Sequence, residues 1–556
     1  MVKGVDKETL DGITLDWFTK TSKQLRAEKF KFRPNRRTHI PKANGKKRPL
    51  GIASPRDKIV QQAMNMVMET VLEPKFLNTS HGFRPYRGCH TALQQVQKWW
   101  GVPWMVEGDI KSFFDSIDHH VLARLLQKNF AEKRLFTLYW KFVQAGYIEF
   151  KNKKKIVIAA DIGVPQGGIL SPLLSNLILH ELDCFIAEKK RQFEESSAGE
   201  KSQKTNPKYS ALTHLIKKCR AINARKELVD ALKLRRNFKP LHPNPKYARI
   251  EYVRYADDWL LGVWGNKALA KSLKTEISNF LESLKLTLSE EKTLITSPRD
   301  RKVKFLGTYI RRIAPTRGPI AKPHSAGRLW MTAPLALITK RLRDKGFWKM
   351  GGNGPVPKAI PKFLAAPVKD LIIRYRSILY GFLNFYSFAR NIRSLIFLYY
   401  LLRGSLKNTI CRKLDIGSKK FDSIYGKNIT IWIQQAKTKN WVELDFAWPT
   451  GIVTRPYIKS ELDPLRAKDW KVSTLTALSQ NCANCAATDN IEMHHVRHLK
   501  TLNAKLSSFD KMMASINRKQ VPLCKRCHRS VHKGEYAGFS LKHFRYIKWE
   551  GQPKWA

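Results

Sequence analysis

The feature that most constrains this chain is a pair of adjacent carboxylates inside an apolar segment. The run Glu251-Tyr-Val-Arg-Tyr-Ala-Asp-Asp-Trp-Leu-Leu-Gly-Val263 places Asp257 and Asp258 between two stretches of high β-propensity. The pattern predicts a β-hairpin with both carboxylates at its tip. Two anions in so apolar a neighbourhood are costly unless cations neutralise them, so the hairpin predicts a site for divalent metal.

Other motifs flank this hairpin in a fixed order. Asp109 ends the apolar run Val106-Glu-Gly-Asp109 and precedes a predicted helix, so its carboxylate could face the hairpin tip. An Asn44-Gly45 dipeptide between basic segments predicts a second hairpin, suited to holding a triphosphate or a nucleic-acid backbone. Three further turns or short motifs are Pro165-Gln166-Gly167-Gly168, Glu291-Lys292-Thr293 and Phe305-Leu306-Gly307.

The charge balance indicates the class of partner. The chain has 556 residues with 102 Lys and Arg against 45 Asp and Glu, a formal net charge of +57. Such an excess attracts polyanions strongly. A merely basic protein is the alternative, but 43% hydrophobic and 11% aromatic residues indicate that the charge lies over foldable cores. We therefore expect a nucleic-acid-binding protein.

Two basic regions leave their roles open. Residues 188–250 contain the runs Glu188-Lys-Lys-Arg191, Lys217-Lys-Cys-Arg220 and Lys233-Leu-Arg-Arg236, which predict an insertion between two core motifs. This insertion is either a solvated helical pair without a ligand or a basic appendage that holds nucleic acid. Residues 334–435 read as helical, and their interleaved aromatic and arginine side chains suit either RNA stacking or a bundle core with a basic outer face.

Cysteine and histidine residues gather near the carboxyl end. Of eight cysteines, Cys89, Cys184, Cys219 and Cys411 are scattered, and the others form the pairs Cys482/Cys485 and Cys524/Cys527. The two pairs predict a tetrahedral structural zinc site in a reducing compartment. The alternatives are a haem-attachment motif at 524–528, which leaves the first pair unexplained, and a DNA-binding zinc ribbon, which needs no extra histidines.

The terminal and apolar segments bear on location. The longest strongly apolar stretch, Ser394–Leu402, is shorter than the ~20 residues that cross a bilayer, so it predicts a buried helix and no membrane partner. The amino-terminal residues have neither a secretory nor an import pattern. The chain is expected to act where it is made, in a bacterial cytoplasm or in an organelle that encodes it, with the mitochondrion favoured over the chloroplast.

Taken in order, Asp109, the Pro165–Gly168 turn, the Tyr255–Asp258 hairpin and the two later motifs resemble group II intron-encoded reverse transcriptases and maturases that end in an HNH endonuclease. The resemblance begins at about residue 35 and covers nearly all that follows. It implies an α+β multidomain fold: right-hand polymerase fingers and palm with an antiparallel palm sheet, a helical thumb and maturase domain, and a small ββα-metal HNH zinc domain.

The implied domain boundaries follow from the same resemblance. Residues 1–315 would form the fingers and palm, with the basic insertion at about 188–250, and residues 316–450 the thumb and maturase region (domain X). A DNA-binding linker would span 451–478 and the HNH unit 479–556. The family usually has a longer extension before its first fingers motif than Gly4–Gly12 provides here, which indicates either a truncated chain or a reading frame that continues from an upstream exon. The resemblance therefore does not extend to the template-switching and intron-binding contacts made by that extension.

The resemblance assigns roles in the polymerase site. Asp109 and Asp257 would bridge two Mg²⁺ ions, and Asp258 would support the ion on the primer side. Phe114 would form a wall beneath the sugar of the incoming deoxynucleotide. Asp115 and Asp118 would cap a helix or pair with lysine or arginine instead of binding metal. Residues expected to contact nucleotide or template are Arg48, Arg84, Gln166, Gly167 and Gly168.

It also assigns roles in the nuclease. His494, His528 and His532 would hold one divalent ion, and His495 would deprotonate the attacking water. Asn517 would orient His495. The Cys482, Cys485, Cys524 and Cys527 thiolates would hold the structural Zn²⁺.

The implied function is RNA-directed DNA polymerase, splicing maturase and site-specific DNA endonuclease acting in intron homing. Its partners would be the protein's own intron RNA, target DNA and deoxynucleoside triphosphates. Two rivals remain: a splicing-only RNA-binding maturase, and a reverse transcriptase recruited to antiviral defence.

Overall fold

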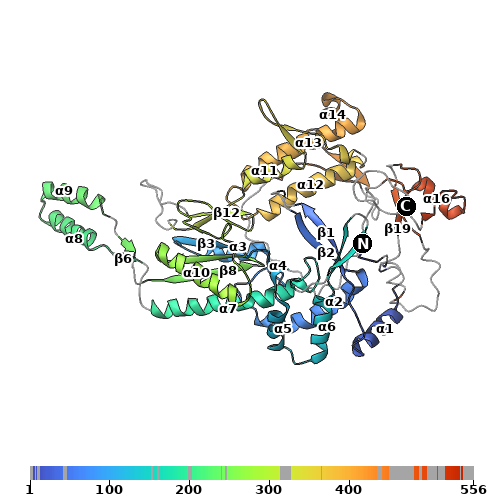
Figure 1. Ribbon diagram of the computed structural model, residues 1–556. Helices are drawn as coiled ribbons and strands as arrows, with labels where there is room; N and C mark the ends of the chain where they lie inside the picture. Colours follow the sequence, from blue (N-terminus) through green and yellow to red (C-terminus); the bar gives the residue numbers. More distant parts are fainter. Residues whose placement is uncertain are drawn as a thin grey trace.

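The computed structural model shows a mixed helix-and-sheet protein with a long arm on one side and a small carboxy-terminal unit on the other (Figure 1). It describes residues 4–6, 8, 10, 13–41, 45, 47–151, 154–158, 162–197, 203–238, 241–243, 247–312, 327–364, 366–434, 441–449, 481–487, 491–496, 510, 520–538 and 540–541. The predicted linker at 451–478 lies outside these residues. No described helix combines the length and the apolar character needed to span a membrane.

A four-stranded antiparallel sheet lies at the centre, in the order β10-β3-β9-β8. Its strands are β3 (Trp104–Gly108), β8 (Arg249–Tyr255), β9 (Asp258–Trp264) and β10 (Leu294–Thr296). Residues 286–295 have a strand-like pattern in the sequence, but apart from an isolated bridge between Ile110 and Leu288 the described pairing of this segment is confined to β10. We call this the central sheet.

Alternating side chains of the central sheet enter two different cores. Val106, Tyr252 and Leu261 pack with α5 (His119–Gln127), α7 (Ser171–Ser196) and α10 (Lys267–Ser283). Met105, Val253 and Leu260 pack on the other side with α3 (Cys89–Gln97) and the helices that follow the sheet. Because both faces are covered, the register of β8 and β9 is fixed.

A second sheet is formed by two hairpins, one before β3 in the chain and one between β3 and β8. Its order is β2-β1-β4-β5, formed by β1 (Asn35–Pro41), β2 (Lys47–Ile52), β4 (Tyr147–Lys151) and β5 (Lys154–Ile158). The β1–β2 hairpin confirms the turn predicted at Asn44-Gly45, of which Gly45 is described. Helix α2 (Pro55–Leu72) leads from β2 toward the central region.

Helix α7 is longer than the sequence indicates. Its apolar pattern ends at about Ile186, but the helix continues to Ser196. Arg191 pairs with Glu188 and Glu195 at i,i+3 and i,i+4 spacing, and such pairs stabilise an exposed helix end. The basic insertion therefore begins later than the predicted residue 188.

The carboxy-terminal half is mainly helical. A three-stranded sheet of β11 (Val303–Phe305), β12 (Thr308–Arg312) and β13 (Leu329–Thr332) precedes α11 (Leu335–Asp344), α12 (Val368–Phe385), α13 (Ile396–Leu414) and α14 (Ser418–Tyr425). Two hairpins accompany them: β14 (Trp348–Gly351) with β15 (Gly354–Pro357), and β16 (Ile431–Gln434) with β17 (Trp441–Leu444). The final unit pairs β18 (Ile491–His495) with β19 (Gln520–Cys524), followed by α16 (Lys525–Lys533).

Candidate functional sites

The first candidate site lies at the turn between β8 and β9, which we call the acidic turn (Tyr255–Asp258). Tyr255 pairs with Asp258, so Ala256 and Asp257 form a two-residue loop, as the sequence predicts. Ala256 has a φ of 56°, a conformation that costs an L-residue of order 1 kcal/mol. Asp109 directly follows β3, the neighbour of β9, and this adjacency brings the third carboxylate beside the turn.

The electrostatics of these three carboxylates call for cations. Withdrawal from water raises the pKa of Asp257, and repulsion from Asp109 adds to the shift. Desolvation raises the pKa of Asp258 to about 6, with further contributions from Asp257 and Asp109. Asp258 nevertheless remains open to solvent on one side, so a ligand can reach it. Three crowded oxygen ligands in an accessible site fit hard divalent ions.

Lys292 supplies a protein cation to the same site. Its Nζ lies 2.6 Å from Oδ2 of Asp109, and this bond raises the pKa of the lysine. The sequence analysis noted the Glu291-Lys292-Thr293 motif without giving the lysine a role. Apart from its position after the hairpin, the motif gives no indication of this role. It lies in a loop, where side chains follow no regular spacing.

The two neighbouring aspartates have structural partners, but only Asp118 caps a helix and pairs with a cation as predicted. Asp118 caps α5 by accepting hydrogen bonds from the backbone N–H groups of His120 and Val121, and it pairs with Lys285 at 2.8 Å. Asp115 accepts a hydrogen bond of 3.2 Å from the Gln166 amide. Neither carboxylate takes part in the repulsion at the acidic turn.

Gln166 links the two sheets beside the acidic turn. Arg48 of β2 donates to the Gln166 Oε1 atom at 2.8 Å, and the Gln166 amide in turn donates to Asp115. Gly167 has a φ of 108°, and a side chain there would press on the Gly51 carbonyl of β2. The glycine thus permits close packing of the turn on β2, whereas the sequence analysis expected close approach to template and nucleotide. Gly168 is buried in the same turn.

Arg84 has a structural role in place of the expected nucleotide contact. Its side chain is 4% exposed and pairs with Glu73 at 2.9 Å. The remaining guanidinium N–H groups donate to the backbone carbonyls of Glu73, Phe76, Leu77 and Ser80. Because these bonds use all the N–H donors of the guanidinium group, Arg84 stabilises the loop that follows α2.

A buried arginine behind the acidic turn was missed by the sequence analysis. Arg254 is fully buried and binds Asp183 of α7 through two bonds of 2.8 and 2.6 Å. Its NH1 atom also donates to the Ala256 carbonyl at 3.1 Å and to Asn176 at 3.0 Å. Arg254 therefore holds the strained turn against α7. The sequence gives no clear signal for this role, because β8 also carries the charged residues Arg249 and Glu251.

The loop before α3 (residues 80–87) packs on the same turn. The backbone N–H of His81 donates to the Arg254 carbonyl at 2.8 Å, and Asn176 donates to the Gly82 carbonyl at 2.8 Å. A Cβ atom at Gly82 would overlap the Ala256 nitrogen, so only glycine allows this approach.

Phe114 lies in the short helix α4 (Phe113–Ser116), next to Asp115 in the chain. It is half-buried, packs edge-on against the buried Phe113, and its carbonyl accepts a hydrogen bond from Val164 at 2.8 Å. We expect Phe114→Val to admit ribonucleotides, raising their incorporation roughly tenfold or more, because the wall beneath the sugar is removed. Primer extension with each nucleotide type measures the change.

Phe113→Leu is the matched control, since Phe113 belongs to the core and should leave discrimination unaltered. Unchanged discrimination in Phe114→Val would show that Phe114 is only a packing residue.

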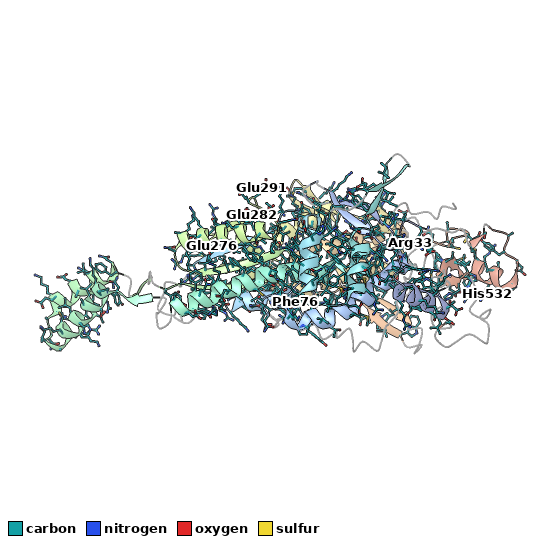
Figure 2. The ribbon with its side chains drawn as sticks, turned by 60° about the horizontal axis from the view of Figure 1, so that its bottom comes forward. Arg33, Phe76, Glu276, Glu282, Glu291 and His532 are labelled. Carbon is teal, nitrogen blue, oxygen red and sulfur yellow. The ribbon has the colours of Figure 1, made fainter. Side chains whose placement is uncertain are left out.

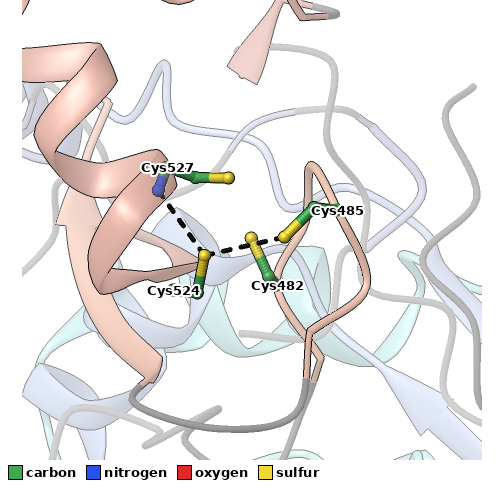
Figure 3. Close-up of side chains that lie close together, drawn as sticks. All are labelled: Cys482, Cys485, Cys524 and Cys527. Carbon is green, nitrogen blue, oxygen red and sulfur yellow. Dashed lines mark hydrogen bonds between the residues drawn. The ribbon is translucent and has the colours of Figure 1, made fainter.

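The second candidate site is a cysteine cluster in the carboxy-terminal unit (Figure 3). The four Sγ atoms of Cys482, Cys485, Cys524 and Cys527 all lie within 4.8 Å of one another. Cys524 stands before the first turn of α16, and the Cys527 N–H donates to its sulfur at 3.5 Å. Four thiols converging from two loops fit a tetrahedral metal ion.

The third candidate site is a histidine cluster beside the cysteines. Ring nitrogens of His494, His528 and His532 lie within 4.8 Å of one another, and the Nε2 atoms of His528 and His532 are 3.0 Å apart. Nδ1 of His528 lies 2.6 Å from Glu492, which the sequence analysis did not single out. A carboxylate in this position fixes the ring so that Nε2 faces the shared ion.

The remaining nuclease residues are placed as follows. His495 follows His494 in β18, so its side chain points to the opposite face of the two-stranded sheet, where Nε2 lies 3.1 Å from the Gln520 amide. Asn517 lies outside the described residues.

The fold and these sites define a class: a polymerase-type acidic turn joined to a metal-binding ββα unit. Three families match successive parts of the chain: reverse transcriptase (RNA-dependent DNA polymerase) at residues 40–310, type II intron maturase at 326–444, and AI2M/AI1M-like HNH endonuclease at 482–528.

Full-length relatives agree with these matches. The group II intron-encoded protein LtrA of Lactococcus lactis is 32% identical over 96% of this chain and 91% of its own length. An uncharacterized 91 kDa protein in the cob intron of Schizosaccharomyces pombe is 34% identical, and the putative COX1/OXI3 intron 1 protein of Saccharomyces cerevisiae is 32% identical, each over 96% of this chain. The chain belongs to the family of group II intron-encoded proteins.

Coverage of the relatives is uneven. The chain spans 66% of the length of both the Schizosaccharomyces and the Saccharomyces relatives. Among solved structures, a telomerase from Candida albicans aligns with a TM-score of 0.37 and 13% identity over 74% of this chain and 60% of that chain.

Proposed function

We propose that this group II intron-encoded protein copies RNA into DNA, assists splicing of its intron RNA, and nicks target DNA during intron homing. The observation that carries the proposal is the meeting of Asp109, Asp257 and Asp258 at a solvent-accessible turn within a chain that also matches maturase and HNH families. The rival splicing-only maturase has no need of this carboxylate set. The defence rival does not account for the maturase match.

In this proposal the central sheet is the palm, the β2-β1-β4-β5 sheet forms the fingers, and α11 to α14 belong to the thumb and maturase region. Two bound Mg²⁺ ions would activate the primer 3′-oxygen and neutralise the triphosphate of the incoming deoxynucleotide. Asp109 and Asp257 would hold both ions, with Asp258 on the primer side. Arg48 and Gln166, which are hydrogen-bonded to each other, would contact the nucleotide, and Phe114 would select its sugar.

The carboxy-terminal unit would cut DNA. The cysteine cluster suits a structural Zn²⁺, because a unit of this size has little apolar core of its own. His494, His528 and His532 would hold one divalent ion that polarises the scissile phosphate. His495 would accept the proton of the attacking water, and Asn517 would orient it.

The partners follow from these activities: the protein's own intron RNA, target DNA and deoxynucleoside triphosphates. Relatives come from a bacterium and from fungi, and one matching plant protein is named as a mitochondrial intron maturase. We propose an organelle, with the mitochondrion favoured over the chloroplast, or a bacterial cytoplasm as the place of action.

Replacing His495 with alanine tests the nuclease part of the proposal. We expect second-strand nicking to fall by roughly a hundredfold or more, because a general base contributes about that much. Zinc content, splicing and copying from a pre-nicked target should persist. Nicking is measured on labelled duplex DNA with the complete ribonucleoprotein.

His120→Ala is the matched control, since His120 is exposed on α5 and far from the histidine cluster in sequence. Normal nicking by His495→Ala would exclude the base role, and purified protein without zinc would exclude the cysteine site.

A further inference from the structure

A helical arm projects away from the rest of the molecule in both views (Figures 1 and 2). It consists of α8 (Pro207–Ala221) and α9 (Arg225–Arg236), which pack side by side. At its base, β6 (Gln203–Thr205) pairs antiparallel with β7 (Leu241–Pro243). The arm lies between α7 and β8, so it interrupts the chain just before the acidic turn.

The distal end of the arm has a defined backbone. Ile222–Ala224 connect the two helices, with Asn223 at a φ of 54°. The Ala224 N–H donates to the Cys219 carbonyl at 3.0 Å, and the Leu228 N–H donates to the Ala224 carbonyl at 3.0 Å. The end of the arm is therefore a closed helical hairpin that holds its side chains in fixed relative positions.

Five cations surround this connection. We define the tip cluster as Lys217, Lys218, Arg220, Arg225 and Lys226, all of which are exposed. The neighbouring acids are Glu227 and Asp230. Within the described part of the chain, no carboxylate lies at salt-bridge distance from any side chain of the tip cluster.

The cations that precede the arm are different. On α7, Lys189 pairs with Glu276 at 2.7 Å, Lys190 with Glu251 at 2.9 Å, and Arg191 with Glu188 at 2.6 Å. These three consecutive cations of α7 each have a carboxylate partner. The tip cluster instead keeps five like charges together, which favours an external polyanion.

The base of the arm already uses its own cations. Lys208 lies over the Phe238 ring at 5.8 Å, and Arg235 lies over the Tyr209 ring at 5.3 Å. These contacts tie the open ends of the two helices together. Lys233 and Arg236 of α9 are also exposed, but the tip cluster is the part of this charge that lies at the far end of the arm, where it can reach a ligand distant from the acidic turn.

We propose that the tip cluster binds the phosphate backbone of a folded RNA. This inference rests on the proposed function, in which intron RNA is the large substrate. RNA is favoured over an acidic protein because three of the five cations are lysines, whereas protein interfaces are depleted of lysine. The cluster would contact phosphates of the RNA backbone and not the bases. Such contacts contribute affinity and fix the orientation of the RNA, but they do not distinguish one base from another.

The test uses the full-length protein and a group II intron transcript in filter-binding titrations over a range of salt. One variant replaces Arg225 and Lys226 with glutamine, and a second replaces all five residues of the tip cluster. The matched control replaces Lys267 and Lys271, two exposed lysines of α10, with glutamine. Each lost phosphate contact should reduce the slope of log affinity against log salt by about 0.7–0.9.

For the five-residue variant we expect a slope lower by about 3.5 to 4.5 and a Kd raised at least roughly tenfold at moderate salt. The double variant should show about two fifths of that change in slope, and the α10 control should show neither effect. Primer extension on a short primer–template should be unaltered in every variant, which separates this inference from the polymerase assignment.

An RNA hairpin and a DNA duplex of equal length serve as second probes. A greater loss of affinity for the folded RNA than for the DNA duplex supports the inference. An equal loss for both probes would show that the tip cluster binds polyanions in general, and this result would overturn the inference. Unchanged affinity and slope in the five-residue variant would also overturn it. A wild-type protein that binds no intron transcript would instead contradict the proposed function itself.

Discussion

Asp257→Asn is expected to reduce complementary-DNA synthesis by roughly a thousandfold or more while leaving intron binding and splicing nearly intact. The substitution removes an anionic oxygen ligand from a site where three carboxylates outnumber Lys292, the lysine bonded to Asp109. It leaves the basic surfaces unchanged. Primer extension on an RNA template and a splicing assay on the same preparation measure the two effects.

Asp118→Asn provides the matched control. Asn is as good a helix cap as Asp, and the exposed pair with Lys285 contributes at most about 1 kcal/mol. Polymerisation should therefore remain near the wild-type level. If Asp257→Asn keeps its activity within about tenfold of wild type, the acidic turn is not the polymerase site.

Arg254→Lys is expected to lower kcat of DNA synthesis by roughly ten- to a hundredfold with little change in KM for the nucleotide. Lysine keeps the charge beside Asp183 but cannot make two bonds to it and also reach the Ala256 carbonyl. The turn that carries Asp257 would lose its support. Steady-state kinetics and a thermal melting curve on the same sample separate geometry from unfolding.

Leu125→Ala is the control for stability alone. Leu125 is buried in the core under the central sheet but does not contact the turn, and its truncation costs about 2–5 kcal/mol. If this variant loses kcat to the same extent as Arg254→Lys, the arginine acts only through stability. Arg254→Met is less informative, because it leaves Asp183 buried without a counter-charge.

The sequence predicts features that depend on local pattern. The β8–β9 hairpin follows from β-propensity on both sides of a short polar loop, and the metal character of Asp257 and Asp258 follows from their apolar surroundings. The paired cysteines converge as their spacing predicts. In each case the residues that define the feature are close in the chain or share a known metal geometry.

Features that depend on distant partners could not be predicted in this way. From the sequence, Arg84 resembles a residue that binds the nucleotide. In the structure its guanidinium is bound instead by Glu73 and by backbone carbonyls of the loop that follows α2. Glu492 becomes a partner of His528 only after β18 and α16 are packed together. Lys292 and Arg254 likewise acquire their roles from residues more than 70 positions away.

The contact between Gly82 and Ala256 has a consequence for protein engineering. Two segments separated by more than 170 residues share one surface with no room for a single additional carbon atom. A chimeric enzyme could take residues 80–87 from one parent and residues 252–258 from another. The two segments would then come from proteins in which they had not packed against each other, and their surfaces would not be complementary. Productive crossovers should therefore transfer both segments from the same parent, even when the intervening arm comes from elsewhere.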